Sequence, residues 1–140
     1  MSENSYTVWF GSNVEFMALE FGHVEHGDPE PYRWVAVEVS FQFGAFKGHY
    51  PASLLTSEVR TLLSDLRELN SAMEGKVEFS ALETQVAFRL TMHATGKLSF
   101  AGELTDAPGR GNRLRFESQI DQTYLEPVIA TLGRVVRDRF

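Results

Sequence analysis

The chain has 140 residues, of which 43% are hydrophobic and 12% aromatic, a size and composition typical of one compact domain. Residues 1–32 hold six acids and no Lys or Arg, whereas the other 108 residues hold 13 acids and 13 bases, so the net charge of −6 comes entirely from the N-terminal quarter. With no cysteine, no uncharged run longer than 11 residues and an acidic balance, the sequence excludes disulfides and thiolate sites, predicts no membrane span and disfavours nucleic acid as a partner.

The first predicted elements are two strands, Thr7–Phe10 and Val14–Phe21, joined by Gly11-Ser12-Asn13. Glycine, serine and asparagine are residue types that hairpin turns use. The next run, Gly22–Pro31, holds two Gly and two Pro and cannot continue a strand ladder, so we expect a loop. Much of the acidic excess falls in this loop.

A third strand is predicted over Tyr32–Phe46, where apolar and polar residues alternate. Its apolar face would be formed by Val35, Val37, Val39, Phe41 and Phe43. We expect Gly44 and Gly48 to bend or end this strand and Pro51 to close it.

A helix is predicted next, capped by Thr56 or Ser57, with Glu58 in its first turn and Gly75 as its stop. Its apolar stripe, at three-and-four spacing, is Val59, Leu62, Leu63, Leu66, Leu69 and Met73. The stripe requires an apolar surface to pack on.

Short alternating runs follow and predict four more strands, at Lys76–Ala81, Gln85–His93, Lys97–Thr105 and Asn112–Ile120. A last helix is predicted from Thr123 or Pro127 to Arg137, with Asp121 as its N-cap. The order βββ-α-ββββ-α predicts an α+β fold, with a curved, mainly antiparallel sheet carrying both helices on one face.

The candidate metal ligands are His23, Glu25, His26 and Asp28, but their spacing matches no standard site. A loop rich in Gly and Pro also does not by itself hold ligand side chains in a fixed geometry. We therefore expect no metal and no cofactor. His49 and His93 are expected to be surface or hydrogen-bonded histidines rather than catalytic bases.

Gly109-Arg110-Gly111 joins two predicted strands, so it favours a hairpin turn over a phosphate loop, which would lead into a helix. Arg113 and Arg115 are expected to pair with Glu103 and Glu117. Acid–base catalysis by carboxylates remains an alternative, since a sequence does not fix the distances between Glu38, Glu78, Glu103 and Glu117. A charged solvent face is the simpler interpretation, and we predict no catalytic residue.

The acidic residues Glu20, Glu25, Asp28 and Glu30 have two interpretations. They can keep a solvated loop polar, or they can form a negative surface that steers and holds a positively charged partner. Nearby aromatics, Trp9, Tyr32 and Trp34, are candidate anchors for such a partner, although sheet packing explains them equally well.

Three segments carry a family resemblance, namely Val37–Gly48, the leucine-rich helix ending at Gly75, and Ile120-Asp121-Gln122-Thr123-Tyr124-Leu125 leading into the last helix. They resemble the WapI-type immunity proteins of bacterial contact-dependent and polymorphic toxin systems. The resemblance spans residues 14–138, and it implies a small cytoplasmic α+β protein without catalysis that neutralises a cognate toxin domain, often a nuclease. It assigns no role to individual residues.

The leading hypothesis is therefore a non-enzymatic, cytoplasmic immunity protein that occludes a toxin domain sterically and electrostatically, with Glu20, Glu25, Asp28 and Glu30 as the partner-binding residues. The N-terminus shows no secretion signal. The alternative is a small-molecule binder with an apolar cavity between sheet and helices, lined by phenylalanines. The sequence leaves the oligomeric state open.

Overall fold

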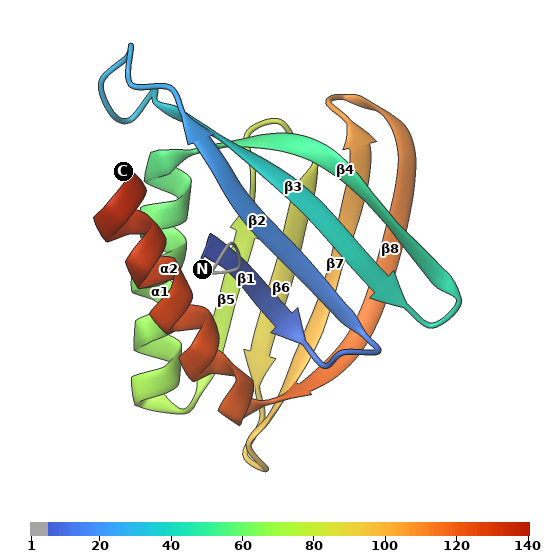
Figure 1. Ribbon diagram of the computed structural model, residues 1–140. Helices are drawn as coiled ribbons and strands as arrows, with labels where there is room; N and C mark the ends of the chain where they lie inside the picture. The colour runs from blue at the N-terminus through green and yellow to red at the C-terminus, as the bar shows by residue number, and fades with distance from the viewer. Residues whose placement is uncertain (1–5) are drawn as a thin grey trace.

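A computed structural model describes residues 6–140, and Glu3, one of the six N-terminal acids, lies outside them. The chain runs through four strands and a helix, and then repeats that order (Figure 1). The elements of residues 6–140 are β1 Thr7–Gly11, β2 Phe16–Val24, β3 Trp34–Phe43, β4 Phe46–Leu55, α1 Thr56–Ala72, β5 Gly75–Ser80, β6 Val86–Met92, β7 Lys97–Ala107, β8 Arg110–Asp121, the 3₁₀ turn η2 Gln122–Tyr124, and α2 Leu125–Arg139. The predicted α+β class, with antiparallel strands and two helices in these residues, is confirmed.

The structure adds β4, a strand that the predicted order lacks. β4 pairs with β3 from Phe43↔Phe46 to Trp34↔Leu55, and Gly44, at φ 64°, lies in the turn between them. Pro51, which we expected to close the third strand, lies inside β4. Because β4 is an edge strand, one side of its backbone has no ladder partner, and a proline is tolerated there.

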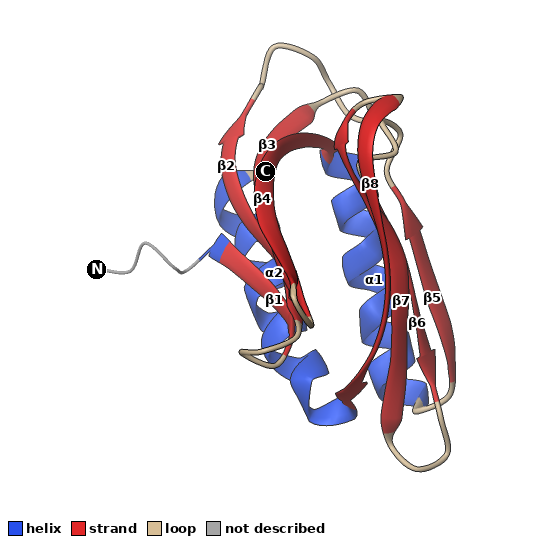
Figure 2. Ribbon diagram, turned by 90° about the vertical axis from the view of Figure 1, so that its right-hand side faces the viewer, coloured by secondary structure: helices blue, strands red, loops and turns tan. Residues whose placement is uncertain are grey.

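The strands of residues 6–140 form two four-stranded antiparallel meanders, sheet A in the order β1-β2-β3-β4 and sheet B in the order β5-β6-β7-β8. The sheets face each other, and their inner faces hold the core between them (Figure 2). This differs from the predicted single sheet, because alternation shows which side of a strand is apolar but not which sheet it joins. The predicted curvature stays a prediction.

Both helices lie along one open side of the two sheets rather than across a face (Figure 1). α2 packs beside β1, α1 packs beside β5, and the helices contact each other. The predicted stripe of α1 is buried except for Met73, which is 44% exposed, and α2 buries Leu125, Val128, Leu132 and Val135. The outer faces of both sheets are left to solvent.

The ends of the helices differ in part from the predictions. Glu58 does lie in the first turn of α1, where its carboxylate accepts a hydrogen bond from the N–H of Leu55, the residue at the N-cap. Met73, at φ 60°, forms the left-handed C-cap, so Gly75 opens β5 instead of stopping the helix. Asp121, predicted as the N-cap of the last helix, caps the turn η2 that leads into α2, and the hydrogen bonds from Thr123 hold the pKa of its carboxyl below its usual range.

Candidate partner-binding surface

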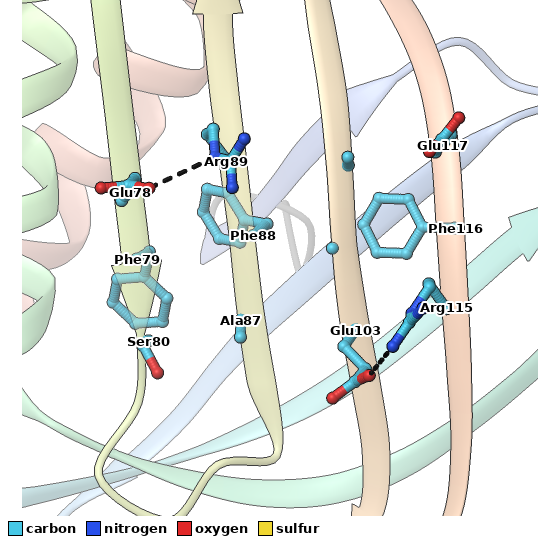
Figure 3. Close-up of a pocket in the computed structure, with 12 residues that line it drawn as sticks. Glu78, Phe79, Ser80, Ala87, Phe88, Arg89, Glu103, Arg115, Phe116 and Glu117 are labelled. Carbon is cyan, nitrogen blue, oxygen red and sulfur yellow. Dashed lines mark hydrogen bonds and ion pairs between the residues drawn. The ribbon is translucent and has the colours of Figure 1, made fainter.

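The outer face of sheet B carries an open hollow of about 610 Å³ (Figure 3). Its small lining residues are Ser80, Ala87, Ala101 and Gly102. Charged side chains surround it and pair with one another, with Glu78 3.2 Å from Arg89 and Glu103 3.5 Å from Arg115. Glu103 pairs with Arg113 and Arg115 as predicted, whereas Glu117, the other predicted partner, forms no ion pair within residues 6–140, so the charge on this face is balanced in part.

The carboxylates considered for acid–base chemistry do not converge on one site. Glu38 lies on sheet A, whereas Glu78, Glu103 and Glu117 lie on sheet B. Of the sheet B residues, Glu78 and Glu103 are each bound by arginine. This arrangement favours a charged solvent face over a catalytic carboxylate pair.

The phenylalanines that suggested a ligand cavity pack against one another between the sheets. The rings of Phe43 and Phe116 are stacked with centroids 4.1 Å apart, and Phe100 contacts Phe10 at 5.8 Å. A hollow of about 300 Å³ lies elsewhere, between the β3–β4 and β7–β8 hairpins, and it is open to solvent. The rings therefore fill the space in which a ligand cavity was expected, which favours a packed core.

The histidines take no part in a metal cluster within the described residues. His23, Glu25, His26 and Asp28 are all exposed, and residues 6–140 contain no group of three or more potential ligands that could hold an ion. His93 is hydrogen-bonded to Ser99 at 2.6 Å. The predicted role of this histidine, as a hydrogen-bonded surface residue, is confirmed.

The loop between β2 and β3, residues 25–33, holds three of the predicted partner-binding acids and is called the acidic loop below. Its backbone is fastened at both ends, since the Glu25 N–H donates to Trp34 O at 2.9 Å and the Arg33 guanidinium donates to Asp28 O at 3.2 Å. The carboxylates of Glu25 and Asp28 are exposed, and no side chain in residues 6–140 pairs with them. They are therefore available to a partner.

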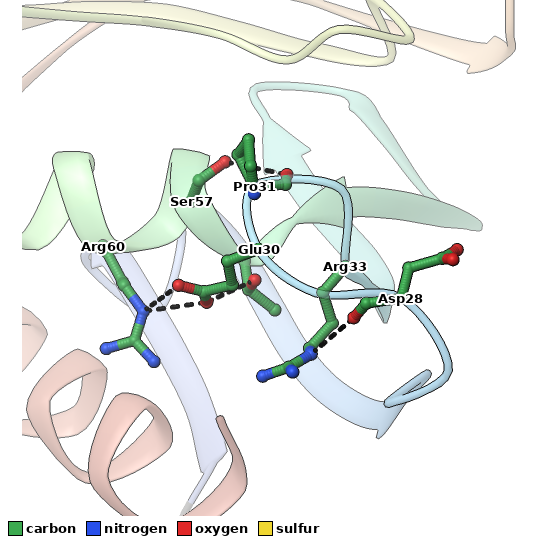
Figure 4. A network of polar contacts seen from close by, with 7 residues as sticks. Asp28, Glu30, Pro31, Arg33, Ser57 and Arg60 are labelled. Carbon is green, nitrogen blue, oxygen red and sulfur yellow. Dashed lines mark hydrogen bonds and ion pairs between the residues drawn. The ribbon is translucent and has the colours of Figure 1, made fainter.

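Glu30 has a different role, because its carboxylate is bound by α1 (Figure 4). It accepts hydrogen bonds from Thr56 Oγ1 at 2.6 Å and from Arg60 Nε at 2.9 Å. These bonds, that of Thr56 foremost, hold the pKa of Glu30 below its ordinary value near 4.5. Ser57 adds a bond to Pro31 O, so this end of the acidic loop is anchored on the first turn of α1.

Glu20 lies apart from the loop, on the outer face of sheet A. It is exposed in β2, directly opposite Glu38 of β3 in the register. Glu38 is joined to His49 of β4 at 2.7 Å, whereas within residues 6–140 no side chain pairs with Glu20. The four predicted acids thus occupy three settings, which are the loop tip, the anchor on α1 and the sheet face.

The candidate aromatic anchors also separate. Trp9, on the outer face of sheet A, is 41% exposed and stacks on Phe16 with ring centroids 4.1 Å apart. Tyr32 is 67% exposed in the acidic loop, and Trp34 is partly buried. Sequence reasoning missed Phe16 as the partner of Trp9 and considered Glu38 only as a candidate catalytic carboxylate, because their positions opposite Gly11 and Glu20 follow only from strand register.

The comparisons with known proteins add a family and a fold. A family model described as the immunity protein WapI-like family matches residues 9–138. No curated protein matches the sequence. The fold resembles a solved structure described as that of the plant transcriptional regulator PBF-2, with a TM-score of 0.56 and 8% identity, over 96% of this chain and 80% of that one. No helix in residues 6–140 is long and apolar enough to cross a membrane.

Proposed function

The chain belongs to the immunity protein WapI-like family, and we propose that it protects a bacterial cell by binding a cognate toxin domain in the cytoplasm and occluding it. The observation that carries the electrostatic part of this proposal is that Glu20, Glu25 and Asp28 are exposed and form no ion pair within residues 6–140. Glu30 contributes by anchoring the acidic loop to α1. The mechanism requires no chemistry by the protein itself.

The charge distribution suits a partner with a positive surface. Exposed carboxylates at the tip of a fastened loop and on the outer face of sheet A attract a basic domain and accelerate its encounter with the chain. A nuclease cleft, which binds phosphates, is such a surface. Occupying the cleft with carboxylates and a folded sheet would block substrate access sterically as well as electrostatically.

The immunity role predicts that a secreted protein with a toxin-like C-terminal domain is encoded beside this chain, and it is tested by coexpression with that domain. We expect growth to be rescued by the wild-type chain and the purified pair to form a complex. Continued growth arrest, with both proteins present and folded, would contradict the immunity role.

The electrostatic mechanism is tested with Glu25→Lys and Asp28→Lys combined. We expect the association rate with the toxin domain at low salt to fall about tenfold or more, with the difference shrinking at high salt because ions screen it. The control is Glu68→Lys with Glu74→Lys, which makes the same charge change at exposed residues near the far end of α1. Equal rates for both double variants would contradict the role of the acidic loop and leave the immunity role standing.

A further inference from the structure

The outer face of sheet A presents an aromatic surface and carboxylates side by side. In the register, Trp9 lies opposite Ala18, and Glu20, two residues further along β2, lies opposite Glu38. Residues two apart on a strand share a face, and diagonal neighbours across a ladder are about 7–8 Å apart, within reach of long side chains. No helix covers this face in Figure 1, where the strands of sheet A stand in front of sheet B.

One face of the Trp9 indole is available for contact. Phe16 stacks against the other face with an interplanar angle of 25°, and the indole N–H donates to Ser12 O at 2.9 Å, which fixes the ring. The side chain nevertheless stays 41% exposed. A fixed, half-exposed tryptophan is the aromatic side chain that attracts cations most strongly.

The carboxylates beside Trp9 lack a full set of counter-ions. Like charges directly opposite each other destabilise a sheet, and here Glu20 faces Glu38. Of these two glutamates, Glu38 is the one that His49 contacts, and His49 carries a charge only when it is protonated. Ala18, which lies between Trp9 and Ser40 in the register, is 3% exposed, so neighbouring side chains cover the backbone beside this pair.

We propose that this face receives an arginine side chain of the toxin domain, stacked on Trp9 and bonded to Glu20 and Glu38. The inference rests on the proposed function and names the surface and the chemistry that the partner must supply. A guanidinium fits because it is planar, always charged, stacks on aromatic rings and forms forked hydrogen bonds to carboxylates. The outer face of sheet B lacks this combination, because its arginines already bind Glu78 and Glu103.

The surface is tested without the toxin by titrating the full chain with a capped hexa-arginine peptide. The chain has two tryptophans, so its two indole N–H signals in an ¹H–¹⁵N spectrum report separately, with Trp34→Phe used for assignment. We expect the Trp9 signal to shift with peptide concentration and the Trp34 signal to shift less. A peptide that binds without moving the Trp9 signal, or one that does not bind, overturns the proposal.

Matched variants then test the individual groups. We expect Glu20→Lys to weaken hexa-arginine binding about fivefold or more, whereas Glu117→Lys, the same change on the exposed side of sheet B, weakens it less. We expect the wild-type chain to bind hexa-arginine more tightly than hexalysine. Trp9→Leu keeps an apolar contact with Phe16 but has no aromatic face, and we expect it to lose this preference. Equal effects of Glu20→Lys and Glu117→Lys overturn the proposal.

The toxin domain separates this inference from the proposed function. If Glu20→Lys and Trp9→Leu leave complex formation and growth rescue unchanged, the arginine site is wrong while the immunity role stands. If the wild-type chain fails to rescue growth, the proposed function fails even where the peptide binds at Trp9.

Discussion

Glu30 shows how one residue in an acidic run can differ from its neighbours in role. Glu25 and Asp28 face solvent, but Glu30 is bound by Thr56 and Arg60 across 26 and 30 residues of sequence. A hydrogen-bonded carboxylate with a cation beside it stabilises the folded state in its ionised form. Glu30 therefore stabilises the folded acidic loop as well as adding to its negative charge.

We predict that Glu30→Gln lowers the free energy of unfolding by about 1 kcal/mol at neutral pH, because the ionised acceptor is lost. The folded-state pKa of Glu30 lies below the unfolded value near 4.5. Its stabilisation is thus fully present above that value and disappears as the pH falls through the folded-state pKa. Urea midpoints of wild type and variant, measured at about pH 7 and pH 3, should differ more at the first pH than at the second.

The control for this prediction is Glu25→Gln, at an exposed carboxylate in the same loop. It should change stability by less than about 0.5 kcal/mol. A Glu30→Gln effect that persists undiminished at pH 3 would show that charge is not its origin.

At the scale of elements, β4 is tied to the other sheet through polar contacts. The buried Tyr50 hydroxyl donates to the backbone oxygen of Gln85 at 2.7 Å, and the Gln85 side chain donates to Pro51 O at 3.2 Å. Gln85 immediately precedes β6. β4, an edge strand that contains a proline, thus forms hydrogen bonds with the segment before β6, whereas sheet A offers it no further strand to pair with.

We predict that Tyr50→Phe costs about 1–2 kcal/mol, because it leaves a buried carbonyl oxygen with one bond fewer. The control, Tyr32→Phe, removes a hydroxyl from an exposed side chain and should be close to neutral. Burial, with the charge of Asp106, raises the pKa of Tyr50 above its usual 10. Tyr50 therefore ionises at a lower pH in the unfolded chain than in the folded protein. Above about pH 10 its ionisation lowers the stability of wild type, and Tyr50→Phe lacks this effect. Equal midpoints for Tyr50→Phe and wild type at pH 7 would contradict the importance of this contact.

At the scale of the whole molecule, both halves of the chain contribute to one core. Phe100 of sheet B contacts Phe10 and Phe43 of sheet A, and it is 1% exposed. Each four-stranded meander has one apolar face, and that face is buried only against the other meander and the helices. We infer that neither sheet retains its structure when the other unfolds.

We predict that Phe100→Ala lowers stability by about 3–5 kcal/mol, through lost burial and the cavity left behind. Both tryptophans lie in sheet A, so their fluorescence reports on the sheet that does not carry the substitution. The fluorescence midpoint in urea should shift together with that of far-ultraviolet circular dichroism. The control Leu82→Ala, at an exposed turn residue, should shift neither of these midpoints. A fluorescence midpoint that stays at the wild-type value would show that sheet A folds independently.

The sequence by itself determined the elements whose signal is local. Alternation identified the strands of the second half, and three-and-four spacing identified α1 and α2, because the side-chain period reports directly which side is apolar. β4 was missed although its residues also alternate, with Tyr50, Ala52 and Leu54 buried, since Pro51 suggested an end. The acidic excess was also visible, because counting charges requires no structure.

Only the tertiary structure decided how these elements combine. The division into two sheets, the stacking of Trp9 on Phe16 and the opposition of Glu20 and Glu38 all depend on strand register. The binding of Glu30 by α1 depends on a contact made 30 residues away. Charge and periodicity are properties of a residue and its neighbours, whereas pairing is a property of the folded chain. The structure therefore divided one acidic segment into an anchor and a surface available to a partner.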